Sequence, residues 1–195
     1  MEEEQLWIRQ AKAGDQRAFT RIVERYQSAV YNLCYRMLGT PPEAEDAAQE
    51  TFLRVYSRLK SYDETRKFSS WLLSIGSHYC IDCLRRRRFT WVDIDDVAPV
   101  LPSDRADEQP ERVALRAESE QNIQALLNGL APDYRTVVVL YYWYHLSYEE
   151  IGDVLKLTEP AIKSRLHRAR KVLADRVLAQ RQAEGRLRPA AAAPA

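Results

Sequence analysis

Apolar residues recur at intervals of three and four along almost the whole chain, and this spacing constrains the fold more than any other feature. One example is the run Phe19, Ile22, Val23, Tyr26 and Val30, whose side chains fall on a single face of a helix. Glycine, which weakens helices, is scarce, with 6 residues in 195. The pattern therefore predicts an all-α protein and argues against a strand-rich fold.

Residues that begin and end helices divide the first half of this pattern. Asp15 is a suitable N-cap and Gly39 a suitable C-terminal residue for one long helix. Thr40 followed by Pro41 opens the next helix, because proline is tolerated in the first turn. A third long helix is expected from about 69 to 87.

The helical pattern is lost between Val92 and Glu111. This stretch holds three prolines and seven acidic residues against one arginine, a net charge of −6. Proline, low hydrophobicity and charge of one sign are typical of a flexible linker. We therefore expect two small helical domains joined by an acidic linker, and a disordered tail rich in alanine and proline, with the boundaries 1–92, 93–112, 113–182 and 183–195.

The second domain contains the pattern of a helix-turn-helix. Ser147 and Glu150 have the spacing of a capping box, which predicts a short helix over 148–155, and Thr158 then caps a last helix. Residues 156–188 hold ten Lys and Arg against three Asp and Glu, net +7, which suits phosphate binding. The alternative is a solvated cationic face. If the last helix enters a DNA groove, its outward residues are Lys163, Ser164, His167, Arg168 and Lys171.

A second basic concentration, over 56–91, is mixed with aromatic residues. Aromatic rings stack on unpaired bases while cations follow the backbone, so this mixture favours single-stranded nucleic acid. Phe68 and Trp71 have a plain alternative as core residues.

The helix that Thr40 opens carries an acidic side, with Glu43, Glu45, Asp46 and Glu50. A carboxylate metal site is not favoured, because the histidines that usually complete such a site are absent. A solvated face and a surface that docks on a basic partner remain as alternatives. The spacing of Cys80 and Cys83 suggests half of a metal site, but no second cysteine pair exists, and both also suit a packed helix.

Motifs of phosphate loops, nucleophile elbows, zinc hydrolases and dinucleotide-binding turns are all absent from the sequence. We therefore expect a protein that is not an enzyme and that needs no metal or cofactor. Three cysteines, an acidic N-terminus and no apolar run of about 20 residues predict a cytoplasmic location without membrane insertion.

Four segments, taken together, resemble one family. They are Pro42-Glu-Ala-Glu-Asp-Ala-Ala-Gln-Glu-Thr-Phe52, Phe68-Ser-Ser-Trp71 with 81–88, Leu146-Ser-Tyr-Glu-Glu-Ile-Gly152, and 162–170. In this order they resemble the extracytoplasmic-function (ECF) group of bacterial sigma factors, the promoter-recognition subunits of RNA polymerase in the sigma-70 family. The resemblance reaches to about Ala179.

The resemblance implies a fold and a set of partners. The first domain, like sigma region 2, would dock on the clamp helices of the largest polymerase subunit, and the second, like sigma region 4, would contact the flap. The residues implied for core-polymerase docking are Asp46, Gln49, Glu50, Phe52 and Leu53. Those implied for the opened minus-ten element, taken with the basic and aromatic mixture, are Lys60, Tyr62, Phe68, Trp71, His78, Arg85, Arg86, Arg87 and Arg88.

For the duplex minus-thirty-five element, the positions implied are Lys163, Ser164, Arg165 and Arg168, beside the outward His167 and Lys171. The family commonly has Asn at the place of His78 and Gly-Thr-Val at the place of Pro160-Ala161-Ile162, so the promoter sequence is left open. The acidic linker would thread through the polymerase cleft.

The expected function is thus an ECF sigma factor that binds core polymerase and promoter DNA, in duplex and single-stranded form, and initiates transcription. A sequestering anti-sigma factor is a plausible further partner and would hold the chain at the membrane. One alternative is a stand-alone helix-turn-helix regulator, and another is a metal-dependent nucleotide hydrolase that uses the four acids named above.

Overall fold

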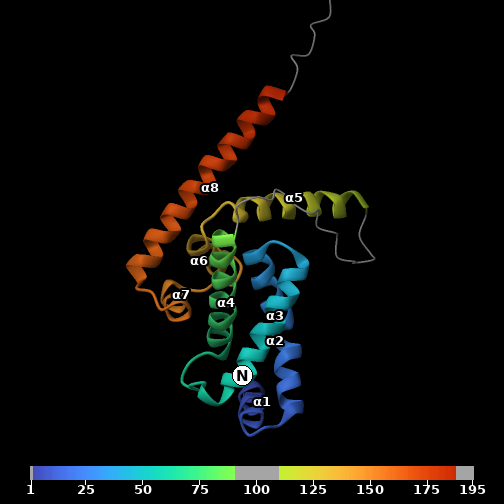
Figure 1. Cartoon of the computed structure of the whole chain (residues 1–195), viewed down its shortest axis with the longest axis vertical. Coiled ribbons are helices and arrows are strands. Elements are labelled where there is room, and N and C mark those ends of the chain that lie inside the picture. Colours follow the sequence, from blue (N-terminus) through green and yellow to red (C-terminus); the bar gives the residue numbers. More distant parts are fainter. Residues whose placement is uncertain (1, 91–109, 188–195) are drawn as a thin grey trace, which may run out of the picture.

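The computed structural model describes residues 2–90 and 110–187. Within these ranges the chain is built from helices and contains no strand, which confirms the all-α prediction. In the order of the chain, the helices are α1 (Glu2–Lys12), α2 (Gln16–Leu38), α3 (Pro41–Arg58), the short 3-10 helix η1 (Leu59–Ser61), α4 (Phe68–Thr90), α5 (Pro110–Asn128), α6 (Pro132–Tyr142), α7 (Tyr148–Leu155) and α8 (Glu159–Leu187) (Figure 1).

Both predicted ends of α2 are confirmed. The carboxylate of Asp15 accepts the main-chain N–H groups of Arg17 and Ala18, at 2.8 and 3.3 Å. Gly39 ends the helix in the left-handed conformation, with φ of 95°, and its N–H donates to the main-chain oxygen of Tyr35 at 2.9 Å. A residue without a Cβ is favoured there.

The first domain packs α2 against α1, α3 and α4 around an apolar core. Cys34 of α2 and Cys80 of α4 are both fully buried in it, whereas Cys83 is half-buried. A hydrogen bond with Cys34, together with burial, raises the pKa of Cys80, so this thiol stays neutral at physiological pH.

The second domain forms the predicted helix-turn-helix. Ser147 Oγ accepts the N–H of Glu150 at 3.2 Å, and Glu150 Oε2 accepts the N–H of Ser147 at 2.9 Å, which completes the capping box of α7. Lys156 ends α7 in the left-handed conformation and turns the chain into α8. The far part of α8 extends beyond the rest of the molecule (Figure 1).

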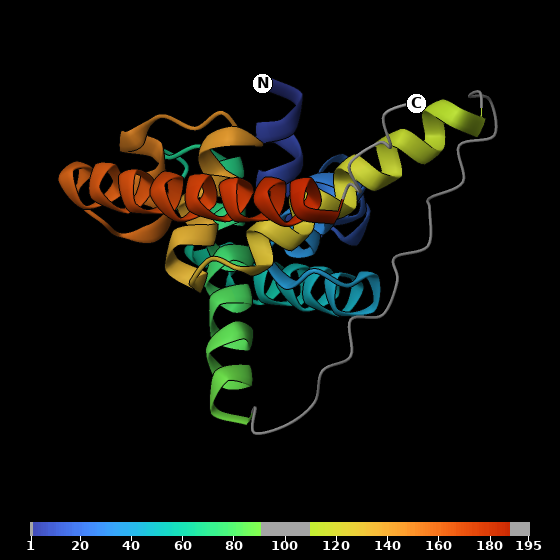
Figure 2. The same ribbon diagram turned by 90° about the horizontal axis from the view of Figure 1, so that it is seen from above.

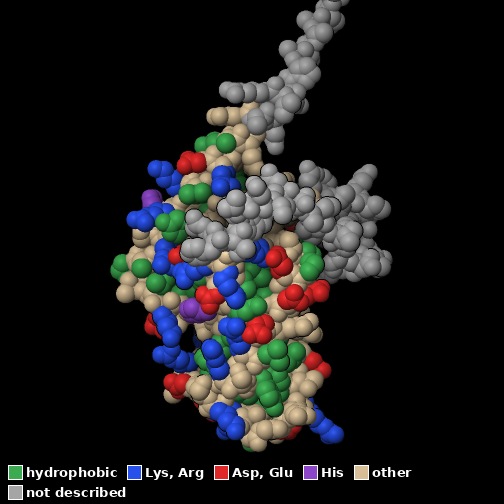
Figure 3. All heavy atoms as spheres, in the orientation of Figure 1, with side chains coloured by type: hydrophobic (Ala, Val, Ile, Leu, Met, Phe, Trp, Pro, Cys, Tyr) green, Lys and Arg blue, Asp and Glu red, His purple; other side chains and the backbone are tan. Residues whose placement is uncertain are grey.

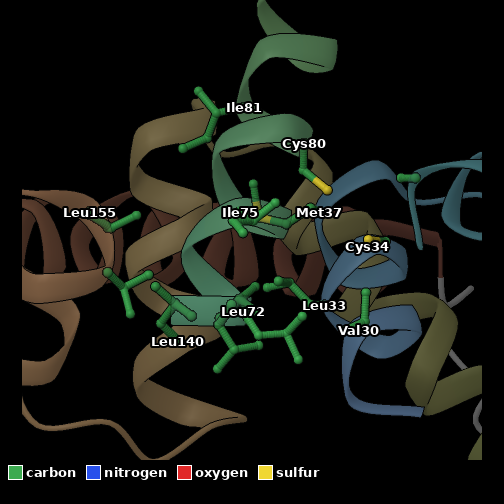
Figure 4. Packing of buried hydrophobic residues seen from close by; sticks show 14 of the residues in the cluster. Val30, Leu33, Cys34, Met37, Leu72, Ile75, Cys80, Ile81, Leu140 and Leu155 are labelled. Carbon is green, nitrogen blue, oxygen red and sulfur yellow. The ribbon is translucent and has the colours of Figure 1, made fainter. Parts of the chain in front are cut away.

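The two domains share one core. Leu140 of α6 and Leu155 of α7 lie in the same buried cluster as Leu33 of α2 and Leu72 of α4 (Figure 4). Helix α6 is the central element of this contact, because its residues 135–140 are all buried. The sequence pattern predicted both domains but not that they would pack on each other.

Three helix ends differ slightly from the expected boundaries. Helix α4 continues to Thr90, past the expected end at 87, and α5 begins at Pro110, inside the expected linker. Helix α8 is described to Leu187, inside the expected tail. The acidic stretch 91–109 and residues 188–195 lie outside the described residues, so the flexible linker and the disordered tail stay predictions.

Candidate nucleic-acid interface

Helix α8 separates an apolar side from a cationic side. Ile162, Leu166 and Ala169 are buried against the domain, as the spacing predicted. The opposite side is exposed to solvent and carries Lys163, Ser164, His167, Arg168 and Lys171, with Arg165 half-buried beside them. Further Lys and Arg side chains lie along the face that carries α8, α7 and α4, with Asp and Glu side chains among them (Figure 3).

Aromatic residues support the cations of α8. Lys163 Nζ pairs with Glu159 at 2.6 Å and lies 5.6 Å from the ring centre of Tyr148. The hydrogen bond with Glu159 raises the pKa of Lys163, so its ammonium stays charged. Arg170 Nε donates to the hydroxyl of Tyr142 at 3.0 Å. A preformed cationic side of this kind suits phosphates and base edges in a major groove.

Two of the aromatic residues predicted to meet DNA are packed in the first domain. Tyr62 and Phe68 are 6 and 4 % exposed, and Trp71 is half-buried. Their rings lie 5.1 to 5.6 Å apart, centre to centre. In this structure the rings of Tyr62 and Phe68 pack edge-on or tilted against other rings of the first domain, and their contact with bases stays a prediction.

The basic residues predicted with them fall into two groups. Lys60 and His78 are exposed, and His78 Nδ1 lies 2.7 Å from the main-chain oxygen of Ser74. Arg85 and Arg86 are also exposed, but Arg85 pairs at 3.1 Å with Asp133 of the second domain.

Unlike Arg85, Arg87 extends from α4 towards the turn between α2 and α3. It pairs with Glu43 and donates to the main-chain oxygen of Leu38 at 3.4 Å. In this structure Arg87 therefore joins α4 to the turn between α2 and α3. The side chain of Arg88 lies outside the described residues.

A cleft of about 990 Å³ lies between the two domains, and it has walls of opposite charge. Carboxylates of α7 approach cations of α3 and of the segment before α4, and Lys67 Nζ donates to Glu150 Oε1 at 2.6 Å. The ionisable residues of the lining are Arg54, Arg58, Asp63, Arg66, Lys67 and His78 from the first domain and Glu149, Glu150, Asp153 and Lys156 from the second.

The residues implied for polymerase docking lie on α3 and are mostly exposed. Asp46 and Gln49 face solvent, Glu50 pairs with Arg54 at 2.7 Å, and Phe52 is packed against the core. Leu53 is 66 % exposed, the largest exposed fraction among the large apolar side chains described.

Tyr56 is 47 % exposed one turn after Leu53, so the two extend one apolar surface along α3. Tyr56 is not among the residues that the family resemblance implies for polymerase docking. The signal was its position three residues after Leu53 on the same helix.

Neither a metal cluster nor a membrane span is found in the parts of the chain that the structure describes. No three His, Cys, Asp or Glu side chains converge there as metal ligands, so the four acids of the hydrolase alternative form no such group. Among the same residues, no helix combines the length and the hydrophobicity that crossing a bilayer requires.

Comparison with known families gives two matches that together cover more than half of the chain. Residues 22–90 match the family model described as Sigma-70 region 2, and residues 120–173 match Sigma-70, region 4. The first match spans most of α2 to α4, and the second spans the end of α5 and the helix-turn-helix.

Relatives of known name agree with both matches. The chain is 41 % identical over 172 residues to the ECF RNA polymerase sigma factor SigW of Bacillus subtilis, covering 85 % of this chain and 92 % of SigW. It is 31 % identical to the RNA polymerase sigma-H factor of Pseudomonas aeruginosa, covering 88 and 92 %. Among solved structures, CnrH in complex with the cytosolic domain of CnrY is 27 % identical with a TM-score of 0.66, covering 91 % of this chain and 98 % of that one.

Proposed function

The chain belongs to the sigma-70 family of RNA polymerase sigma factors, in its ECF group, and from this premise we propose how its two domains divide promoter recognition. The first domain docks on core polymerase and binds the opened minus-ten element. The second domain reads the minus-thirty-five element as duplex. The chain itself performs no catalytic step, because the polymerase active site makes the RNA.

The observation that carries this proposal is the construction of α8. Its buried side anchors the helix through Ile162 and Leu166, while the opposite side offers cations to a groove. Lys163 and Ser164 lie near the N-terminal end of the helix, which is the part that meets base edges in a helix-turn-helix. Arg168 and Lys171 follow on the exposed side and suit phosphates.

For the minus-ten element, the exposed cations of the first domain provide the backbone contacts. Arg58 and Arg66 are exposed and line the same cleft as the half-buried Trp71, and Lys60 is exposed as well. A cationic groove beside an aromatic ring is the arrangement that holds unstacked bases. Tyr62 and Phe68 support Trp71 from inside, so their contribution here is to position it.

For polymerase docking, the exposed side of α3 supplies both charge and apolar area. Leu53 and Tyr56 give an apolar centre, and Asp46 and Gln49 give a polar edge. Large apolar residues exposed next to one another are typical of a protein interface.

A sequestering partner fits the same proposal. The structure of CnrH was solved with the cytosolic domain of CnrY, so at least one related fold is bound by a second protein. We extend this to an anti-sigma factor for the present chain, which works in the cytoplasm and is held at the membrane when that factor is anchored there.

The experiment that tests the proposal is footprinting on promoter fragments with and without core polymerase. A sigma factor protects both elements only in the presence of core, whereas a stand-alone regulator protects duplex DNA alone. Protection of two elements that requires core supports the proposal. Equal protection without core would replace it with the regulator alternative.

A further inference from the structure

The closed arrangement of the two domains cannot serve both promoter elements at once. Elements centred about 10 and 35 base pairs upstream are separated by about 85 Å of straight duplex, at about 3.4 Å per base pair. A compact chain of this size is only about 40 Å across. In this structure α7 packs directly on α4, so the domains must separate before the proposed function begins.

The contact between the two domains covers the proposed minus-ten surface, but it leaves the proposed minus-thirty-five and polymerase-docking surfaces exposed. The minus-ten side, with Arg66 and Lys67, forms one wall of the interdomain cleft. By contrast, the recognition side of α8 and the docking side of α3 around Leu53 face solvent. Figure 1 shows α7 beside α4 and the far part of α8 rising above both domains, and Figure 2 shows α8 from above, where it crosses over the rest of the chain.

The wall of the cleft that α7 forms carries negative charge, as the phosphates of DNA do. Glu149, Glu150 and Asp153 of α7 line the cleft opposite the cations. The Lys67 ammonium donates to Glu150 Oε1 at 2.6 Å, a contact that a phosphate oxygen also makes with lysine. Carboxylates therefore stand where the phosphates of the minus-ten strand are proposed to bind.

A hydrogen bond in the first turn of α7 fixes the side chain of Glu150 in position for this contact. Its second oxygen, Oε2, accepts the N–H of Ser147 in the capping box, so the carboxylate cannot rotate away freely. Its hydrogen bond with Lys67 lowers the pKa of Glu150, and the side chain is ionised at neutral pH. One residue thus begins α7 and also joins it to the first domain.

We propose that the acidic side of α7, formed by Glu149, Glu150 and Asp153, masks the minus-ten surface of the free chain by substituting for DNA phosphates. This self-masking deepens the proposed function and rests on it. Since the docking side of α3 stays exposed, core polymerase can bind the masked chain first, and separation of the domains then uncovers the minus-ten surface. Exposed charges are screened by salt, so the mask weakens as ionic strength rises.

The contact is tested directly by zero-length carbodiimide crosslinking, which links a carboxylate to an amine only when the two touch. The unmodified full-length chain should give an amide between Lys67 and Glu150, identified by peptide mass spectrometry. Glu150→Gln should abolish this link while keeping the cap, because glutamine also serves at this position of a capping box. Saturating single-stranded oligonucleotide, about 20 nucleotides of mixed sequence, should reduce the link in the unmodified chain.

The masking is tested by the affinity for the same fluorescent oligonucleotide without polymerase. The cleft variant is Glu149→Gln with Glu150→Gln and Asp153→Asn. Its control removes three charges elsewhere, through Glu24→Gln, Glu120→Gln and Asp175→Asn, all at exposed positions. The cleft variant should bind roughly threefold or more tightly than the control at low salt, and the difference should shrink at high salt. The shared apolar core limits the gain, because it holds the domains together without the charges.

Equal affinities of the two triple variants, or a Lys67–Glu150 link that persists at saturating oligonucleotide, would overturn the masking. If the triple variant does not fold by circular dichroism, Glu150→Gln against Asp175→Asn gives the same comparison with one charge each. Failure of the proposed function is a separate result: the chain would then give no initiation with core polymerase, whatever the crosslink and the oligonucleotide affinities show.

Discussion

Arg135 of α6 donates from Nη1 to the main-chain oxygen of Met37 at the end of α2, at 2.5 Å, although 98 residues separate the two in the chain. The same guanidinium donates from Nη2 to the main-chain oxygen of Asn128 at the end of α5, at 2.7 Å. The last carbonyls of a helix have no partner within it and carry partial negative charge. One buried cation therefore satisfies the ends of two helices and joins the domains.

Removing this guanidinium should destabilise the whole chain. Arg135 is 5 % exposed, and burial lowers its pKa to about 10, so it remains charged at neutral pH. We expect Arg135→Ala to lower the free energy of unfolding by about 2–4 kcal/mol, since it leaves buried carbonyls without donors. Urea denaturation followed by circular dichroism measures this. Arg181→Ala, at an exposed position of α8, is the control, and an equal effect of both would contradict the assigned role.

Two glycines with the same backbone conformation test the contact between α2 and α5. Gly14 and Gly39 have φ of 102 and 95°, so alanine is strained at both. A Cβ at Gly39 would lie 2.9 Å from Asn128 Oδ1, whereas no described atom lies within 4 Å of one at Gly14.

We expect each alanine variant to cost about 1 kcal/mol through the backbone, and Gly39→Ala to cost more. The reason is that Asn128 Oδ1 also accepts from Gln124 and Arg135, so pushing it aside disturbs a network. Thermal melts of both variants give the difference. Identical melting temperatures would show that Asn128 yields freely.

Charge placed on the exposed side of α3 should weaken polymerase binding without unfolding the chain. Leu53→Asp removes the apolar centre of the docking side, and we expect at least a tenfold loss of affinity for core polymerase, as for an interface anchor. Leu6→Asp on α1 is the matched control, because Leu6 is also exposed, at 48 %. Fluorescence anisotropy with purified core measures both affinities. A Leu53→Asp chain that binds core normally would remove α3 from the docking surface.

Substitutions on the exposed side of α8 should have the opposite result, a loss of DNA binding without a loss of core binding. Lys163→Ala removes a proposed base contact and should weaken binding of the matching minus-thirty-five duplex about tenfold. Arg168→Ala removes a proposed phosphate contact and should weaken binding about equally for all duplex sequences. Both variants should leave core binding unchanged. Competition with mutated duplexes in the holoenzyme measures the loss position by position. Loss of core binding in the same variants would indicate misfolding instead.

Local helix chemistry was the part of the fold that could be predicted from the sequence. Asp15, Gly39 and the Ser147–Glu150 capping box act between neighbouring residues, so their spacing alone predicted the helix ends that the structure confirms. The buried side of α8 was predicted for the same reason, because periodicity of 3.6 residues selects one side of a helix.

Contacts between distant segments could not be predicted in this way. Nothing in the spacing showed that Glu150 would pair with Lys67 or that Tyr62 would be buried, since these depend on how whole helices pack. The burial of Phe68 agrees with the core alternative that its sequence offered. The burial of Arg135 had only a weak signal in the sequence, namely one cation beside the apolar run that begins at Val137. A cation in a helix that is buried all round has to find acceptors inside the protein.

Run-off transcription with purified core polymerase on genomic DNA fragments, with and without the chain, tests the central claim most directly. Mapping of the 5′ ends should reveal discrete new start sites that require both core and the chain and that share two upstream elements. These elements would also supply the promoter sequence that His78 and Pro160 leave open. Absence of any core-dependent start site, while the chain alone binds duplex DNA, would contradict promoter recognition as a polymerase subunit.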